Sequence, residues 1–135
     1  MAITLDWVKD QQYTAQDENG HGIVVESRSE GVPAGFTPAQ LLLVATAGCM
    51  ANHVLAILAK KRLKPIKLRV LADGVRADEH PRRYISISLT FEMSGEVPLQ
   101  VLEDVIQLSK DKYCSVLNTL GPGTAITCVS KMSSE

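Results

Sequence analysis

The feature that most constrains this chain is a long apolar segment, residues 41–58, with the sequence LLLVATAGCMANHVLAIL. Thr37, before it, suits a helix N-cap, and Pro38 suits the first helical position. We expect a helix from there to about Lys61, some 24 residues and roughly 36 Å long. Because this helix is apolar almost all round, most of it must be buried. A domain of 135 residues offers too little material to surround it, so the sequence indicates a second subunit.

The same segment is not expected to span a membrane. Gly48, Asn52 and His53 interrupt it, whereas a spanning helix needs about 18 or more cleanly apolar residues. The first residues, MAITLDWVKDQQ, lack the basic start and apolar run of a signal peptide. The cysteine count of three fits a reducing compartment better than a disulfide framework. We therefore expect a soluble cytoplasmic protein with no membrane partner.

Composition excludes two other classes. Apolar residues make up 45% of the chain and charged residues 21%, which predicts a folded domain with a sizeable core rather than a disordered chain. No linker or repeat divides the sequence, so we expect one domain over residues 1–135. The net charge of −1, the absence of a basic stripe and an aromatic content of 4% argue against a nucleic-acid partner.

The segments that flank the long helix predict strands and two further helices. Alternation of polar and apolar residues is typical of half-buried strands. A helix is expected from Pro98 to Tyr113, and a short one from Cys114 to the Gly121 stop. The order β-β-α-β-β-α-β predicts an α+β domain, with helices packed against a curled antiparallel sheet. The expected strands are residues 2–8, 23–27, 66–77 (Ile66, Leu68 and Val70 inward), 84–93 (Ile85, Ile87, Leu89, Phe91 and Met93 inward) and 124–132.

Two cysteines, Cys49 in the long helix and Cys114 before the short one, have two interpretations. Either both are small buried hydrophobes, or the fold brings them together as a redox pair. A cysteine inside an apolar helix is most often the former. Cys114, however, follows two lysines and is expected to begin a helix, where backbone N–H groups would lower its pKa. Cys128, on an apolar strand face, is interpreted as structural.

Neighbouring polar residues leave further alternatives open. Cys49 and His53 are spaced i, i+4 and share a helix face, so with Cys114 they could supply three metal ligands. The sequence has no CxxC or HxxxH motif, however, and no metal site is predicted. His53 is then a partly buried polar residue or a charge partner of a thiolate. Arg28 is either a solvated arginine or a guanidinium that stabilises a thiolate or a bound peroxide. A Cys–His hydrolase would need an orienting residue that the sequence does not reveal.

The segment TPAQLLLVATAGCMANHVLAIL, followed by DKYCSVLNTL, resembles the OsmC/Ohr family, and most closely its YhfA-like branch. The family is named for osmotically inducible protein C and organic hydroperoxide resistance. The resemblance covers essentially the whole chain. It implies the OsmC-like fold, in which curled antiparallel sheets pack around a long central helix. It also implies an intertwined homodimer with two active sites at the subunit interface.

The chemistry that the resemblance implies is thiol-dependent reduction of organic hydroperoxides. By position, Cys49 matches the cysteine that attacks the peroxide and becomes a sulfenic acid. Cys114 matches the resolving cysteine that condenses with it to a disulfide. A dithiol, of the lipoyl type in the family, then reduces the disulfide, and no organic cofactor or metal is needed. The apolar helix around Cys49 favours organic substrates over hydrogen peroxide.

This sequence departs from the family pattern just after the helix proline. Well-studied peroxidase members have a glutamate there, which helps to hold a catalytic arginine, whereas this chain has Ala39 followed by Gln40. Arg28 matches that arginine by region only. Arg28, Gln40 and His53 are therefore candidate supporting residues. The departure motivates an alternative, an OsmC-like dimer that binds a small apolar ligand at the subunit interface with little or no peroxidase activity. A purely structural dimer is the third interpretation.

Overall fold

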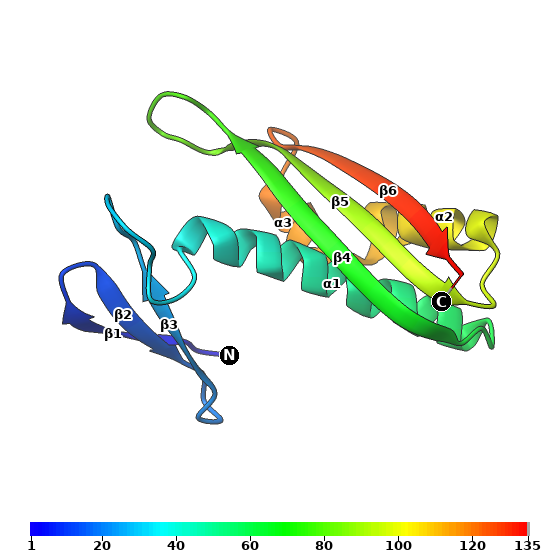
Figure 1. The fold of residues 1–135 in the computed structure, drawn as a ribbon, viewed down its shortest axis with the longest axis horizontal. Helices are drawn as coiled ribbons and strands as arrows, with labels where there is room; N and C mark the ends of the chain where they lie inside the picture. Colours follow the sequence, from blue (N-terminus) through cyan, green and yellow to red (C-terminus); the bar gives the residue numbers. More distant parts are fainter. Residues whose placement is uncertain (135) are drawn as a thin grey trace. The chain divides into compact units, whose positions relative to one another are not determined.

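The computed structural model describes residues 1–134, and its contacts divide the chain into two compact units, Met1–Leu42 and Leu43–Glu135. Strands and helices occur in the order shown in Figure 1, and the α+β class is confirmed. The longest helix, α1 (Pro38–Lys60), begins in the first unit and continues into the second. Its bounds agree with the predicted helix to within one residue at its C-terminal end.

The N-terminal unit contains an antiparallel three-stranded sheet, β1 (Thr4–Lys9), β2 (Gln12–Gln16) and β3 (Gly22–Glu26). Strand β2 was not predicted, because its short QYTAQ sequence has only a weak alternation of polar and apolar residues. In the structure it pairs with a strand on each side, β1 and β3. The pairing register puts apolar side chains on one face of this sheet. They are Leu5, Trp7, Tyr13, Ala15, Ile23 and Val25.

A capping box begins helix α1. The backbone N–H of Gln40 donates to Thr37 Oγ1 at 3.2 Å, and the Thr37 N–H donates to Gln40 Oε1 at 2.9 Å. These two bonds satisfy donors that would otherwise lack a partner at a helix N-terminus. The predicted cap at Thr37 is confirmed, and the Gln40 side chain is used in the same motif.

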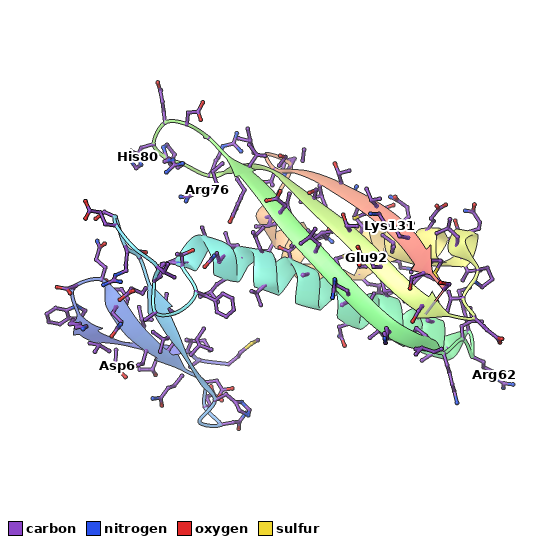
Figure 2. All side chains as sticks on the ribbon, viewed as in Figure 1. Asp6, Arg62, Arg76, His80, Glu92 and Lys131 are labelled. Carbon is purple, nitrogen blue, oxygen red and sulfur yellow. The ribbon has the colours of Figure 1, made fainter. Side chains whose placement is uncertain are left out.

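The C-terminal unit contains the sheet β4 (Pro65–Arg76), β5 (Tyr84–Gly95) and β6 (Ala125–Ser133), in that spatial order. Strands β4 and β5 are antiparallel, but β5 and β6 are parallel, so the prediction of a wholly antiparallel sheet is wrong for this pair. The long connection between β5 and β6 crosses over through helices and permits parallel pairing. In this register Glu92 lies beside Lys131, and Figure 2 labels both on the neighbouring strands.

The connection from β5 to β6 consists of α2 (Leu99–Leu108), a π-helical turn η1 (Ser109–Tyr113) and α3 (Ser115–Leu120). The predicted helix from Pro98 to Tyr113 is thus two elements, since its last five residues take wider π geometry. The predicted short helix is confirmed, and Gly121 ends it with a φ of 79° that glycine adopts readily.

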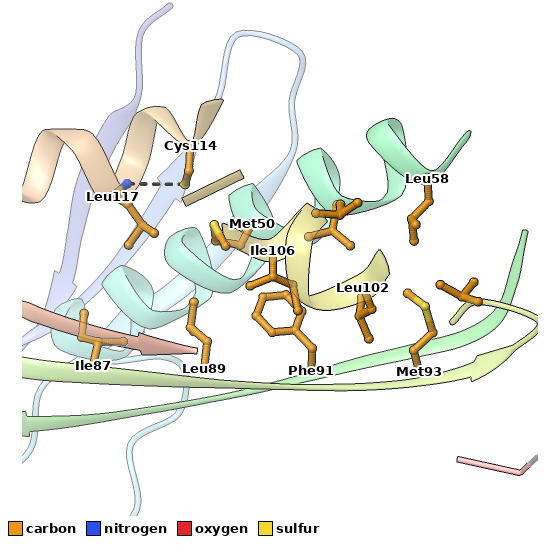
Figure 3. Packing of buried hydrophobic residues seen from close by; sticks show 13 residues of the cluster. Met50, Leu58, Ile87, Leu89, Phe91, Met93, Leu102, Ile106, Cys114 and Leu117 are labelled. Atoms are coloured by element: carbon orange, nitrogen blue, oxygen red, sulfur yellow. Dashed lines mark hydrogen bonds between the residues drawn. The ribbon is translucent and has the colours of Figure 1, made fainter. Parts of the chain in front are cut away.

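The core of the C-terminal unit lies between β5 and the helices α1 and α2 (Figure 3). Four of the five inward residues predicted on β5 are buried, whereas Ile85 is 42% exposed near the strand start. On β4, Ile66 was expected inside but is 71% exposed, because a register shift between Pro65 and Lys67 turns it outward. Fully buried members include Met50, Val54, Leu58, Leu89, Phe91, Met93, Leu102 and Val105.

Only one side of α1 is covered by this core. Its buried residues Thr46, Met50, Val54 and Leu58 recur every four positions, as expected of one helix face. By length and composition α1 would be apolar enough to cross a membrane, a test that the core helix of a soluble protein also passes. Val44 and Leu55 remain exposed on the single chain.

Candidate active site

Two elements of the C-terminal unit bring a cysteine each to one place. Helix α1 carries Cys49, and the junction between η1 and α3 carries Cys114. The junction is held by two bonds to Ser109, whose hydroxyl donates to the Val105 carbonyl at 2.8 Å and whose carbonyl accepts the Cys114 N–H at 2.8 Å. The π-helical turn therefore ends with the Cys114 side chain directed into the core, and Cys114 is 0% exposed.

The Cys49 and Cys114 side chains lie close enough that each affects the pKa of the other, and both thiols are free. Cys49 is partly exposed, whereas Cys114 is buried. The hydroxyl oxygen of Ser115 lies 4.0 Å from Cys49 Sγ. The structure thus brings together the two cysteines that the sequence predicts as a pair.

The surroundings of Cys49 favour its thiolate. Burial acts to raise the pKa of the Cys49 thiol, but hydrogen bonds from the Val116 backbone, the Cys114 side chain, and the Ser115 side chain and backbone outweigh it. The net result is a pKa below the ordinary value of 9.0. A thiolate is the nucleophilic form of cysteine, so these surroundings favour the nucleophilic form of Cys49.

The surroundings of Cys114 favour its neutral thiol. Burial raises the pKa of Cys114 to about 11, although its sulfur accepts a hydrogen bond from the Leu117 N–H at 3.5 Å. Cys114 does occupy the N-cap of α3, as predicted. The prediction that this position would lower its pKa is wrong, because desolvation of a fully buried thiol outweighs the backbone N–H groups.

An aromatic pair joins the same two elements. The rings of His53 and Tyr113 have centroids 6.1 Å apart and an interplanar angle of 26°. His53 follows Cys49 by one helical turn, and Tyr113 directly precedes Cys114. The Lys112 Nζ lies 5.5 Å from the centre of the Tyr113 ring, within the range of a cation–π contact. The pair thus ties η1 to α1 beside the two thiols.

The remaining residues singled out in the sequence, Arg28, Gln40 and Cys128, lie in other parts of the structure. Arg28 lies in the N-terminal unit, where its Nε is 3.3 Å from Glu26 Oε2 and its guanidinium donates to the Val32 carbonyl. Gln40 also belongs to that unit and is part of the capping box. Cys128 is on β6, where it packs against the core cluster and burial raises the pKa of its thiol.

Metal binding has no support within residues 1–134. No three side chains of His, Cys, Asp or Glu in that range are grouped so that they could hold a metal ion. Cys49, His53 and Cys114 therefore do not form the three-ligand set that their spacing allowed.

Sequence reasoning missed Ser115, Tyr113 and the backbone of Val116. Each is adjacent or nearly adjacent to Cys114 in the chain. A signal was present, since the first backbone N–H groups of a helix lack intrahelical partners and can bond to a group near its N-terminus. The sequence could not show that this contact would be Cys49.

Comparison with known proteins agrees with these features. A profile of the family described as OsmC-like protein matches residues 30–129. Protein YhfA of Escherichia coli strain K12 is 30% identical over 129 residues, and the match covers 94% of each chain. A crystal structure of a protein from Aquifex aeolicus VF5 has a TM-score of 0.88 at 28% identity, covering 99% of this chain and 96% of that one.

Structures of lower identity share the fold. The OsmC-like protein of Mycoplasma pneumoniae has a TM-score of 0.86 at 21% identity, covering 97% of this chain and 95% of that one. An organic hydroperoxide resistance protein from Elizabethkingia anophelis has a TM-score of 0.77 at 12% identity, covering 97% and 94%. The profile match spans most of the chain, and it includes both cysteines of the pair. From its sequence profile, its relatives and its fold, this chain belongs to the OsmC family.

Proposed function

We propose that this protein is a thiol-dependent peroxidase that reduces organic hydroperoxides through Cys49 and Cys114. The observation that carries the proposal is the asymmetry between these two neighbouring thiols. Cys49 is partly exposed and has a lowered pKa, whereas Cys114 is buried and has a raised pKa. Cys49 is suited to attack a peroxide that arrives from solvent, and Cys114 remains a neutral thiol beside it.

In the first step the Cys49 thiolate attacks the peroxide. A sulfur–oxygen bond forms as the O–O bond breaks, so that the sulfur is oxidised to a sulfenic acid and the peroxide is reduced. The departing alkoxide takes a proton from solvent and leaves as an alcohol. The Ser115 hydroxyl and the backbone N–H groups of Ser115 and Val116 lower the pKa of Cys49 and so increase the fraction of thiolate that can attack.

In the second step Cys114 resolves the sulfenic acid. A sulfur–sulfur bond forms and the sulfur–oxygen bond of Cys49 breaks, so the hydroxyl group leaves with the Cys114 proton as water. A dithiol reductant, of the lipoyl type, then reduces the disulfide by exchange and restores both thiols. This cycle balances without a metal or an organic cofactor.

A homodimer is the assembly that fits the exposed surface. In the N-terminal unit, Leu5, Trp7 and Ile23 share one sheet face, and Trp7 is 70% exposed on the single chain. On α1, Val44 and Leu55 are also exposed. Exposed apolar surfaces of this kind mark interfaces, and a second copy of the chain would cover them. Because the proposed reaction needs two reduced thiols, the proposal includes a cytoplasmic location.

The test is the reaction of the reduced protein with one equivalent of cumene hydroperoxide, with hydrogen peroxide in parallel. We expect the intact mass to fall by two hydrogens and two free thiols to disappear, with peptide mapping to a Cys49–Cys114 disulfide. Cys49→Ser should not react, whereas Cys128→Ser should behave as the unaltered protein. Catalytic turnover is then measured with a lipoyl dithiol. Thiols that stay unchanged in the folded protein would reject the proposal.

The alternative, a dimer that binds a small apolar ligand with little or no peroxidase activity, is favoured by one observation. Ala39 stands where peroxidase members of the family have a glutamate. This alternative predicts that an apolar ligand stabilises the protein thermally even when both Cys49 and Cys114 are replaced by serine. A strict requirement for the two thiols would count against it.

A further inference from the structure

Three hydrogen bonds hold Cys114 within its own segment of the chain. The Cys114 N–H donates to the Ser109 carbonyl at 2.8 Å, and the Asn118 side chain donates to the Cys114 carbonyl at 2.7 Å. The Cys114 sulfur accepts a bond from the Leu117 N–H, which Figure 3 draws as a dashed line. These three bonds shape the η1–α3 junction. They do not fix the junction against α1, because all their donors and acceptors lie in residues 109–118.

An aromatic pair links this junction to α1. The rings of His53 and Tyr113 are stacked, with centroids 6.1 Å apart and planes inclined by 26°. Tyr113 is the last residue of η1 and directly precedes Cys114. His53 lies one helical turn after Cys49, on the same face of α1. The stack therefore connects the chain neighbour of one thiol to the helix face of the other, and η1 cannot move away from α1 without breaking it.

The two rings lie outside the buried core cluster. Tyr113 is 44% exposed and His53 is half-buried, so truncation of either ring leaves no large internal cavity and should cost little stability. The main influences on the pKa of Cys49 are burial and residues 114–116. The contact that His53 offers to the thiol pair is thus its stack on Tyr113.

From these contacts we infer that His53 is a positioning residue for the resolving step. By stacking on Tyr113, it keeps Cys114 within reach of the Cys49 sulfenic acid. The inference rests on the proposed function. In this step the two sulfurs form a bond, the sulfur–oxygen bond of Cys49 breaks, and the hydroxyl group leaves with the Cys114 proton as water. A disulfide forms only in a narrow range of distances and dihedral angles, so a junction that moves freely would reach that geometry less often.

The test follows the sulfenic acid after the reduced protein is mixed with an excess of cumene hydroperoxide. Samples quenched with acid are analysed by intact mass, because the sulfenic acid is heavier by one oxygen and the disulfide is lighter by two hydrogens. The resolving step is thereby measured separately from the attack. His53→Ala should slow resolution by between about twofold and tenfold, the loss expected when an aromatic pair is removed. His53→Phe, which keeps a ring without the imidazole, should restore the rate.

Further variants distinguish positioning from a general loss of structure. Tyr113→Ala should slow resolution as His53→Ala does, and the double variant should slow it no further, because both changes remove one contact. Asn52→Ala is the matched control, an exposed neighbour of His53 on α1, and should resolve at the rate of the unaltered protein. Thermal unfolding checks that each variant is folded. Equal slowing in His53→Phe and His53→Ala would overturn the inference, since the stack would then not be the cause.

A second measurement needs no peroxide. In a buffer of glutathione and glutathione disulfide, the Cys49–Cys114 pair exchanges with glutathione disulfide, which forms the protein disulfide and two molecules of glutathione. His53→Ala should lower this equilibrium constant by a factor similar to its effect on resolution. An unaltered protein that does not consume peroxide would reject the proposed function, whereas this equilibrium would still decide the inference. An equilibrium constant that His53→Ala leaves unchanged would overturn it.

Discussion

At the scale of single residues, Ser115 has the clearest effect on the chemistry. Its hydroxyl oxygen lies 4.0 Å from Cys49 Sγ, and both its side chain and its backbone lower the pKa of that thiol. Cys114, its neighbour in the chain, has its pKa raised by burial. Both adjacent residues lower the pKa of Cys49, Ser115 through its hydroxyl and backbone and Cys114 through a side chain that itself stays a neutral thiol.

We predict that Ser115→Ala shifts the pH profile of Cys49 alkylation to higher pH. The hydroxyl lowers the pKa of Cys49, so its removal raises that pKa and leaves less thiolate at neutral pH. The measurement is the rate of iodoacetamide labelling at Cys49 between pH 6 and pH 10, followed by mass spectrometry. The rate of labelling at pH 7 should fall by less than about tenfold, because other hydrogen bonds to Cys49 remain.

Thr119→Ala is the control for that experiment. Its hydroxyl donates to the Ser115 carbonyl at 2.7 Å, so it perturbs the same short helix without touching Cys49. It should leave the profile in place. Cys128, whose pKa is raised by burial, is an internal reference that should label only at higher pH than Cys49. An unchanged profile in Ser115→Ala would show that the backbone alone holds the thiolate.

At the scale of elements, β5 organises the C-terminal unit. It pairs with β4 on one side and β6 on the other, and its inward side chains meet α1 and α2 (Figure 3). Phe91, at the middle of the strand, is 0% exposed, and the figure shows it beneath Ile106. The position of Cys114 depends on this packing, because α2 leads directly into the turn that carries it.

We predict that Phe91→Ala destabilises the reduced protein by about 3–5 kcal/mol, the usual range for removal of a buried aromatic ring. Urea unfolding followed by circular dichroism measures the change. Leu71→Ala is the control on the adjacent strand, since Leu71 is 61% exposed on the single chain, and it should change stability by less than about 1 kcal/mol. Equal effects of the two changes would contradict the assignment of the core.

At the scale of the whole molecule, the exposed apolar residues lie on a regular sheet and on a regular helix. The sheet of the N-terminal unit has one apolar face, and α1 has an uncovered side with Val44 and Leu55. Their exposure on the single chain is the physical basis for the proposed homodimer.

We predict that the protein is a dimer in solution and that Trp7→Asp weakens it. A carboxylate in the middle of an apolar interface would be buried without a partner, which opposes association. Size-exclusion chromatography with light scattering, over a range of protein concentrations, measures the molar mass. Thr14→Asp, on the opposite face of the same sheet, is the control and should remain a dimer. A monomer at all concentrations of the unaltered protein would reject the homodimer.

The sequence by itself determined the elements whose signals are local. The bounds of α1 followed from Thr37, Pro38 and a continuous apolar run, and the inward face of β5 followed from strict alternation. Both patterns depend only on neighbours along the chain, which is why they could be predicted without a fold. The identity of the two candidate cysteines was available from the motif around each one.

The tertiary structure alone decided the features that depend on contacts between distant segments. The parallel pairing of β6 and the outward turn of Ile66 arise from register between strands. The pKa of Cys114 is raised rather than lowered because burial depends on what the fold places around it, and the local helix start is the weaker effect. The effect of Cys114 on the pKa of Cys49, and the contact of Ser115 with Cys49, exist only because α1 and the η1–α3 junction meet in space.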